Sequence, residues 1–260
     1  MTNVIAVSGK GGTGKTTLST LVIEYLLGRD LKPILAVDAD SNSNLHTALG
    51  VSLLSTVGGV REEMTEKTKK QQLPAGMSKQ DLLEMQIEQA LVETKEFDLI
   101  SMGRPEGPGC YCAINNMLRV FLDRMSKNYR FVVVDNEAGM EHLSRRTNHD
   151  VDIMFVVSDP SRRGLDTAVR IRDLAVDMDL EVKKFYLVFS RVRGDLEDSL
   201  EAEAMDLDME IAGMIPDDPE VARLDAEGKP LTGLSAGSAA RAAVGEMMEA
   251  VTGELTGVKK

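Results

Sequence analysis

The feature that most constrains this chain is a glycine-rich segment near its start, SGKGGTGKTT at residues 8–17. Gly9, Gly14, Lys15 and Thr16 match the spacing G-x-x-x-x-G-K-[ST], which is typical of a loop that wraps phosphates. An apolar, strand-like run precedes the segment and an apolar helical pattern follows it. Because a helix N-terminus and inward-facing backbone N–H groups favour an anion, the segment predicts a phosphate-binding loop between a buried strand and a helix.

The residues of this loop have distinct expected tasks. Lys15 would contact the β- and γ-phosphates and assist catalysis, and Thr16 would offer its hydroxyl to Mg²⁺. The other expected nucleotide-binding positions contribute backbone groups or small side chains: Gly9, Gly11, Gly12, Thr13, Gly14 and Thr17. The alternative is a chance glycine-rich turn, which the flanking strand and helix disfavour.

Val- and Ile-rich runs alternate with longer helical patterns along the rest of the chain. Several runs are apolar at both odd and even positions, which is typical of strands covered on both faces. The rhythm predicts an α/β fold, a doubly wound and mainly parallel sheet of about seven or eight strands flanked by helices, in one domain over residues 1–260. The expected strands are residues 3–7, 33–37, 99–102, 131–134, 153–157, 185–189 and 210–214, and the expected helices are residues 15–27, 79–92, 114–127, 165–178, 196–205 and 239–251.

Residues 51–96 interrupt this rhythm. They include the charge-dense stretch REEMTEKTKKQQ and carry no strand signal. We expect a partly mobile helical excursion beside the second strand. A solvated helical surface is favoured over a partner-docking surface, because charge runs of this kind usually face solvent.

The charge balance restricts the partners. The 260 residues contain 42 acidic and 30 basic side chains, a formal net charge of −12. Residues 1–130 carry 15 of each sign, so the whole excess lies in residues 131–260. Nucleic acids and anionic membranes require a basic face, and neither is expected as a partner.

Other composition features point to a soluble cytoplasmic protein. No apolar run approaches the roughly 18 residues that a membrane-spanning helix requires. Two cysteines are too few for a secreted protein that is held together by disulfides.

Acidic residues follow two of the expected strands. Asp38 and Asp40 lie in the segment DADSNSN, and Asp135 ends the run FVVV. The carboxyl ends of parallel strands meet at one edge of a sheet, beside the phosphate loop, where a metal-bound nucleotide needs acidic groups. Asp38 and Asp135 are therefore expected to support Mg²⁺, Asp135 through water, and turn-forming or helix-capping aspartates are the alternative.

Both cysteines fall in one motif, Gly109-Cys110-Tyr111-Cys112, just before an expected helix. A thiolate near a helix N-terminus is stabilised, which suits a metal ligand or a redox thiol. One chain offers two thiolates, whereas a closed zinc site needs four ligands. A two-fold dimer would complete an S₄ site for Zn²⁺ or Ni²⁺ with Cys110 and Cys112 of both copies. Two buried small side chains or a local disulfide are the alternatives.

Lys10 makes the loop KGGTGKTT, which resembles the deviant phosphate loop of the ATPase class that includes MinD, ParA and the nitrogenase iron protein. The resemblance implies ATP rather than GTP, and a nucleotide-dependent homodimer in which Lys10 reaches the partner's nucleotide. It also implies that Asp40 lies in switch I and orients or activates the attacking water. Gly139 would lie in switch II and contact the γ-phosphate.

Two further segments resemble the base-binding side of the same class. Arg191 matches the second residue of an Asn-Lys or Asn-Arg pair, and Ser190 replaces the asparagine. The serine hydroxyl would take over part of the hydrogen bonding to the base. The segment IPDDP at residues 215–219 resembles the adenine-side loop of the class, so Pro216 would pack on the base and Asp217 would lie beside it.

The Cys-x-Cys motif, together with DNEAGMEHLSRRT at residues 135–147, resembles the CooC-type accessory ATPases. The resemblance implies ATP or ADP and Mg²⁺ as cofactors. It also implies nickel insertion into carbon monoxide dehydrogenase or a related Ni-Fe-S enzyme such as acetyl-CoA synthase, which would be the client. The main alternative is a positioning or partition ATPase that acts on membrane or DNA. A reductase with an Fe–S cluster at the dimer axis fits the Cys-x-Cys spacing poorly.

Overall fold

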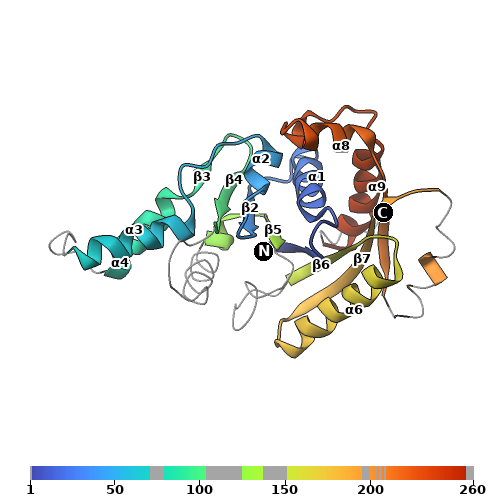
Figure 1. Cartoon of the computed structure of the whole chain (residues 1–260), viewed down its shortest axis with the longest axis horizontal. Helices are drawn as coiled ribbons and strands as arrows, with labels where there is room; N and C mark the ends of the chain where they lie inside the picture. The colour runs from blue at the N-terminus through green and yellow to red at the C-terminus, as the bar shows by residue number, and fades with distance from the viewer. Residues whose placement is uncertain are drawn as a thin grey trace.

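One mainly parallel sheet organises the molecule (Figure 1). The computed structural model describes residues 2–70, 79–103, 125–136, 151–194, 200–202, 204, 207 and 209–255. In these residues the sheet has eight strands in the order β3-β4-β2-β5-β1-β6-β7-β8. The strands are β1 (Asn3–Gly9), β2 (Ile34–Ala39), β3 (Val92–Glu93), β4 (Asp98–Ser101), β5 (Phe131–Asn136), β6 (Val151–Ser158), β7 (Val182–Val192) and β8 (Ile211–Pro216). The predicted doubly wound α/β fold is confirmed.

Helices cover both faces of this sheet. Helices α1 (Lys15–Gly28), α8 (Pro219–Ala226) and α9 (Ala239–Leu255) lie above it in Figure 1, and α6 (Arg162–Asp177) lies below it. The described residues also form α2 (Leu45–Leu49), α3 (Val57–Lys69), α4 (Lys79–Gln89) and two short 3₁₀ turns, Ser126–Asn128 and Leu231–Gly233. None of the helices in the described ranges is both long and apolar enough to cross a membrane.

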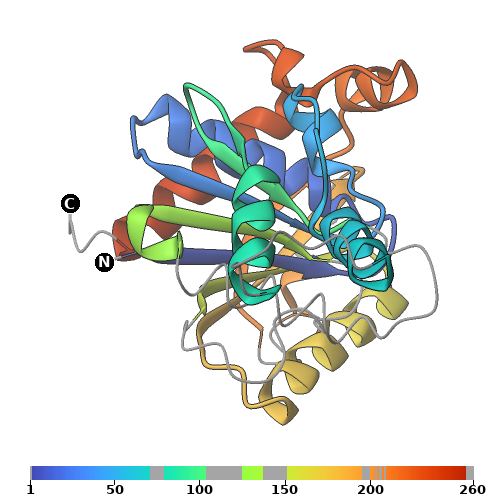
Figure 2. The same ribbon diagram turned by 90° about the vertical axis from the view of Figure 1, so that its left-hand side faces the viewer.

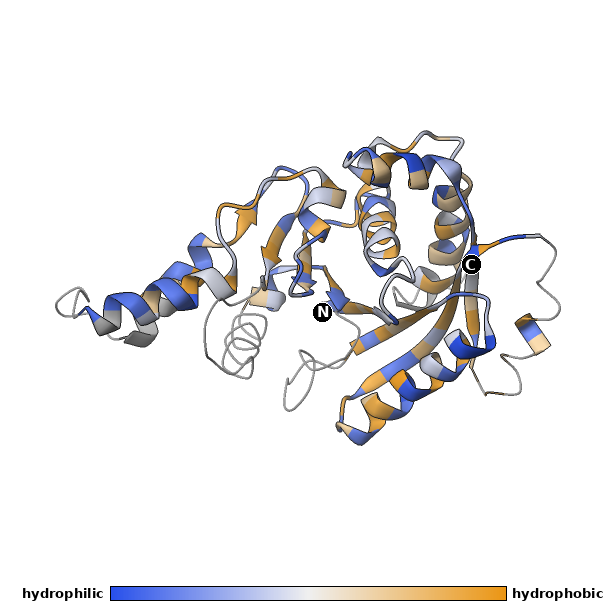
Figure 3. Cartoon of the chain, viewed as in Figure 1, coloured by the Kyte–Doolittle hydropathy of each residue, from blue (hydrophilic) through white to orange (hydrophobic). Residues whose placement is uncertain are grey.

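The central strands are apolar at both odd and even positions because alternate side chains pack into two different hydrophobic cores, one on each face of the sheet. In β1, Ile5 and Val7 pack in the core formed with α1 and α9, whereas Val4 and Ala6 pack in the core formed with α6. Successive strand side chains point to opposite faces of a sheet. The coloured ribbon in Figure 3 shows the apolar strands at the centre, between helices of mixed polarity.

Residues 51–96 contain helices α3 and α4, and they also contain a strand that was not predicted from the sequence. Helices α3 and α4 extend away from one end of the sheet (Figure 1), the end that faces the viewer in Figure 2. Many of their residues are coloured as hydrophilic in Figure 3. Strand β3 then pairs antiparallel with β4, with Val92 opposite Leu99 and Glu93 opposite Asp98. A two-residue strand is too short to produce a periodic signal in the sequence. Because β3 occupies Val92 and Glu93, helix α4 ends at Gln89, before the predicted end at residue 92.

Most predicted elements lie within two or three residues of the observed ones, and two fall largely outside the described residues. Those are the predicted helix 114–127, of which only residues 125–127 are described, and the predicted helix 196–205. Helix α6 begins at Arg162, three residues before the predicted start, because the Ser161 hydroxyl caps it by accepting from the Gly164 N–H.

Candidate nucleotide-binding site

The phosphate loop lies where β1 meets α1, as the sequence predicts. Gly14 occupies the N-cap position of α1 with a left-handed backbone, φ 88°, and no side chain caps the helix. The first N–H groups of α1 are therefore available to an anion. Gly9 is needed for space, since a Cβ atom there would lie 2.4 Å from the carbonyl oxygen of Val157 on β6.

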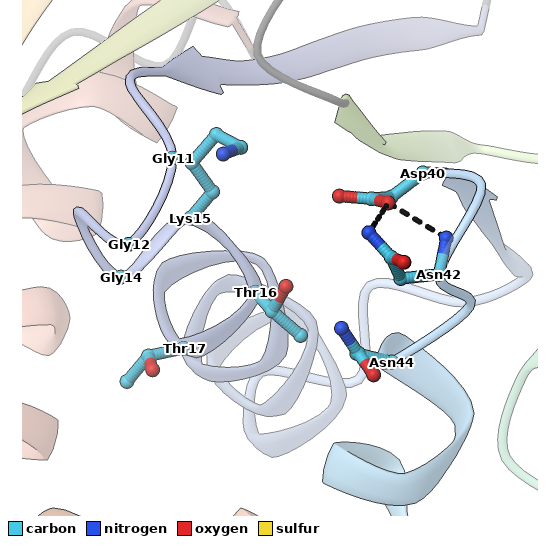
Figure 4. Close-up of a pocket in the computed structure, with 9 residues that line it drawn as sticks. All are labelled: Gly11, Gly12, Gly14, Lys15, Thr16, Thr17, Asp40, Asn42 and Asn44. Atoms are coloured by element: carbon cyan, nitrogen blue, oxygen red, sulfur yellow. Dashed lines mark hydrogen bonds between the residues drawn. The ribbon is translucent and has the colours of Figure 1, made fainter.

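A cavity of about 360 Å³ opens over this loop (Figure 4). Its lining residues come from the loop, from α1 and from the segment after β2: Gly11, Gly12, Gly14, Lys15, Thr16, Thr17, Asp40, Asn42 and Asn44. Lys15 is buried and its ammonium donates to the Lys10 carbonyl at 3.3 Å. Figure 4 shows the ammonium of Lys15 and the carboxylate of Asp40 on opposite sides of the cavity.

Beneath the loop, two carboxylates lie on adjacent strands. Asp38 on β2 and Asp135 on β5 are register partners, and both are almost completely buried. Asp135 accepts from the Thr16 hydroxyl at 2.7 Å and from the Ser19 hydroxyl at 3.1 Å. Asp38 accepts from the backbone N–H groups of Leu45 at 3.0 Å and Asp40 at 3.2 Å.

This pair is electrostatically costly without a cation. Burial and the neighbouring charge of Asp135 raise the pKa of Asp38 to about 7, although two backbone N–H bonds oppose the shift. Burial likewise raises the pKa of Asp135 to about 6, although hydrogen bonds from the Thr16 and Ser19 hydroxyls and the charge of Lys15 act to lower it. Oxygen ligands beside a phosphate site suit Mg²⁺, so Thr16, Asp38 and Asp135 form a donor set that fits this ion.

Asp40 lines the cavity with its carboxylate held by one neighbour. Its Oδ1 accepts from the backbone N–H of Asn42 at 2.8 Å and from the Asn42 side-chain amide at 2.9 Å. Three further polar residues near this site, Asn42, Asn44 and Ser19, were not predicted from the sequence. The two asparagines in DADSNSN were a visible signal, and Ser19 lies one helical turn from Thr16 on the same face of α1.

A second cavity, of about 350 Å³, opens on the other side of the α1 N-terminus. It shares Gly12, Gly14 and Thr17 with the first cavity, and its remaining walls come from α1, the end of β7, the loop after β8, and helices α8 and α9. The predicted base-side residues Arg191, Pro216 and Asp217 line it. The hydroxyl of Ser190, however, donates to the carbonyl of Thr13, so its proton is directed at the loop rather than at the cavity.

Several predicted site residues lie elsewhere. The Lys10 side chain is exposed and does not line the cavity over its own loop. Cys110, Cys112 and Gly139 lie outside the described residues. Among the residues that the structure describes, no group of three His, Cys, Asp or Glu side chains could hold a metal ion.

The model of the CobQ/CobB/MinD/ParA nucleotide-binding domain matches residues 4–231. This range includes both acidic strand ends, the whole lining of the first cavity, and the lining of the second cavity except Ala240. The chain belongs to this family. As a member, it is an ATPase of the MinD and ParA class with a nucleotide-binding domain.

Individual relatives of this MinD/ParA-class ATPase are similar over nearly the whole chain. An ATP-binding protein of Methanocaldococcus jannaschii is 48% identical over 231 residues, 89% of this chain and 91% of that protein. The carbon monoxide dehydrogenase accessory protein CooC of Rhodospirillum rubrum is 29% identical over 237 residues, 86% of this chain and 87% of that protein. The septum site-determining protein MinD of Pyrococcus horikoshii, solved with Mg-ADP, shares the fold with a TM-score of 0.69 at 22% identity, covering 100% of this chain and 99% of that one.

Proposed function

We propose that this chain is a CooC-type accessory ATPase, which couples ATP binding and hydrolysis to dimerisation and to nickel insertion into a client Ni-Fe-S enzyme. The observation that carries the ATPase part is that Lys15, Thr16 and Asp40 line one cavity. The buried pair Asp38 and Asp135 lies next to it, since Asp135 accepts a hydrogen bond from Thr16. The client would be carbon monoxide dehydrogenase or acetyl-CoA synthase. The Cys110-x-Cys112 motif and the similarity to CooC support the nickel role.

In the proposed reaction the chain acts mainly by positioning and charge neutralisation. Lys15 and the free N–H groups of α1 hold the β- and γ-phosphates. Thr16, Asp38 and Asp135 would hold Mg²⁺, Asp135 through water, and the bound ion would neutralise charge on the phosphates. Asp40 orients the attacking water, and Asn42 holds the Asp40 carboxylate in place. The predicted roles of the remaining residues complete the site: Gly139 would contact the γ-phosphate, and Pro216 and Asp217 would lie beside the base.

The dimer part of the proposal is supported by the place of Lys10. Its side chain is exposed at the loop while its carbonyl accepts from Thr13 and Lys15, so the backbone is held and the ammonium is directed outward. A second copy placed across this edge would receive Lys10 at its own nucleotide. The same dimer would join two Cys110-x-Cys112 motifs into a four-thiolate site for Ni²⁺ or Zn²⁺.

Nucleotide binding and hydrolysis test the first part. Lys15→Ala should abolish ATP binding measured by calorimetry, because no other side chain lining the cavity is cationic. Asp40→Ala should still bind ATP but hydrolyse it slowly. Full hydrolysis by Asp40→Ala would remove Asp40 from the proposed role.

Metal-dependent assembly tests the second part. We expect ATP together with Ni²⁺ or Zn²⁺ to shift wild-type protein from monomer to dimer in light scattering. The Cys110→Ala/Cys112→Ala variant should lose bound metal and the metal-dependent share of the dimer. An unchanged metal content in that variant would contradict the shared site.

A MinD-like positioning ATPase is the second candidate, and the common fold favours it. In that case the chain would bind an anionic membrane or DNA when loaded with ATP. The nickel role predicts metal-dependent dimerisation and no binding to membrane or DNA. A test of binding to anionic vesicles and to DNA therefore distinguishes the two proposals.

A further inference from the structure

Two neighbouring side chains at the end of β7 donate to two neighbouring carbonyls of the phosphate loop. The Ser190 hydroxyl donates to the Thr13 carbonyl at 2.5 Å, and the Arg191 guanidinium donates to the Gly12 carbonyl at 2.5 Å. Ser190 and Thr13 are both buried, whereas Arg191 lies at the mouth of the second cavity. These two bonds connect the wall of the base-side cavity directly to the loop that faces the phosphates.

A regular strand could not make both contacts. Successive side chains of an extended strand point to opposite faces, so the two residues would diverge. Here Arg191 has a left-handed backbone with φ 55°, and the register between β7 and β8 shifts between Ser190 and Val192. That conformation is unfavourable for a residue with a side chain and persists only where the surroundings determine it. At this position it turns both side chains towards the loop.

We propose that Ser190 and Arg191 are positioning residues, which clamp the phosphate loop in its phosphate-binding conformation and do not recognise the base. The proposal rests on the ATPase part of the proposed function. In a trans peptide the carbonyl and the following N–H point in opposite directions. Pinning the Thr13 carbonyl to Ser190 therefore directs the Gly14 N–H away from β7, and pinning the Gly12 carbonyl fixes the preceding peptide.

The clamp has a consequence for selectivity. The Ser190 hydroxyl and one nitrogen of the Arg191 guanidinium donate to carbonyls of the loop. These donors are therefore not available to hydrogen-bond with a base. Loss of either contact should weaken the binding of any triphosphate by the same factor, whether or not it carries a base. A base-recognising residue would instead affect only ligands that contain the base.

Calorimetry with two ligands separates these outcomes. Mg·ATP and inorganic Mg·tripolyphosphate would be titrated into wild type, Ser190→Ala and Arg191→Gly; glycine tolerates the positive φ while removing the guanidinium. We expect both variants to weaken both ligands equally, by about 3- to 10-fold for the neutral Ser190 bond and by about tenfold for the Arg191 bond. Ser190→Thr, which keeps the hydroxyl, should restore the affinity.

Asp225→Ala is the matched control. Asp225 lines the same cavity from α8 and makes no side-chain contact with the phosphate loop among the described residues. It should leave tripolyphosphate affinity unchanged whatever its effect on ATP. Loss of ATP affinity alone in Ser190→Ala or Arg191→Gly would overturn the clamp, as would unchanged affinity for both ligands. If wild type bound neither ligand, the ATPase part of the proposed function would fail instead.

Discussion

Asp38 and Asp135 are the residues at which the site departs most from ordinary protein chemistry. Two carboxylates on adjacent strands are both almost wholly buried, and their charges repel each other. Hydroxyl and backbone donors satisfy their oxygens but do not supply a positive charge. Among the described residues, the charge of Lys15 lowers the pKa of Asp135. The pair therefore stores unfavourable energy that a bound Mg²⁺ would relieve.

The first prediction concerns pH. An unfolded aspartate has a pKa of about 3.9, and the folded values are raised to about 7 for Asp38 and about 6 for Asp135. Between about pH 4 and pH 7 the folded state therefore binds more protons than the unfolded state. The free energy of unfolding of the nucleotide-free protein should fall as pH rises through this range. Urea unfolding at pH 5 and pH 7.5 measures the change.

Asp38→Asn should reduce this pH dependence, because it removes one titrating group and the repulsion on Asp135. The exposed Asp177→Asn variant is the control and should retain the wild-type dependence. Equal slopes in all three proteins would contradict the assignment.

A second prediction concerns Gly9. An alanine Cβ would lie 2.4 Å from a backbone oxygen of β6, which cannot move without disturbing the sheet. Gly9→Ala should lower the free energy of unfolding by about 1–3 kcal/mol and displace the loop, so ATP affinity should fall too. Gly11→Ala is the control, since a Cβ there meets nothing within 4 Å. Equal stability of the two variants would show that the contact of the Cβ with the Val157 carbonyl oxygen does not destabilise the protein.

At the scale of elements, Asp218 joins two helices to the base-side cavity. Its carboxylate accepts from the Glu220 N–H at 2.8 Å, which caps α8, and from the Ser238 hydroxyl at 2.7 Å and the Ala240 N–H at 3.0 Å, which begin α9. Burial disfavours the charged form, but these hydrogen bonds outweigh it and lower the pKa of Asp218. One side chain thus holds the start of α8 and the start of α9, two of the helices that line the cavity.

Asp218→Ala should reduce the free energy of unfolding by about 2–3 kcal/mol, because two helix starts lose their acceptor. The pKa is lowered in the folded state, so the stabilisation is complete above the unfolded pKa and is lost as pH falls through the folded value. Asp217→Ala is the control, because Asp217 pairs with the exposed Arg193 at 2.6 Å and such surface pairs contribute about 1 kcal/mol or less. Urea unfolding of both variants decides between a capping role and a surface role.

At the scale of the whole molecule, the orientation of α9 bears on the choice between the two functions. Its apolar residues Val244, Met247, Met248 and Val251 are buried in the core with α1 and β8. Arg241 at its start pairs with Glu24 of α1 at 3.0 Å, and Glu249 pairs with Arg29. The apolar face of α9 is therefore already used inside the protein and is not presented to a lipid surface.

The last prediction follows from this arrangement and from the acidic second half of the chain. With Mg·ATP present, sedimentation with vesicles rich in anionic lipid should carry down no more protein than a lipid-free sample. Agarose gel shift with duplex DNA should likewise show no complex. ATP-dependent binding to either surface, abolished in Lys15→Ala, would favour the MinD-like alternative over the nickel role.

Local sequence alone determined the fold class and predicted the phosphate loop. The phosphate loop is recognised by four residues whose spacing lies within one short segment of the chain. A strand that is covered on both faces is recognised by apolar residues at both odd and even positions. The acidic ends of β2 and β5 were visible for the same reason, since each follows its own strand. The roles of Cys110, Cys112 and Gly139 stay predictions, because they lie outside the described residues.

Only the tertiary structure decided which of these residues meet. Asp38 and Asp135 are 97 positions apart in sequence and become neighbours through the pairing of β2 with β5. Ser190 and Arg191 reach Thr13 and Gly12 because the end of β7 arrives beside the loop with one left-handed residue. Such contacts depend on strand order and on one backbone angle, which are set by the packing of the whole sheet and leave no periodic trace in the sequence.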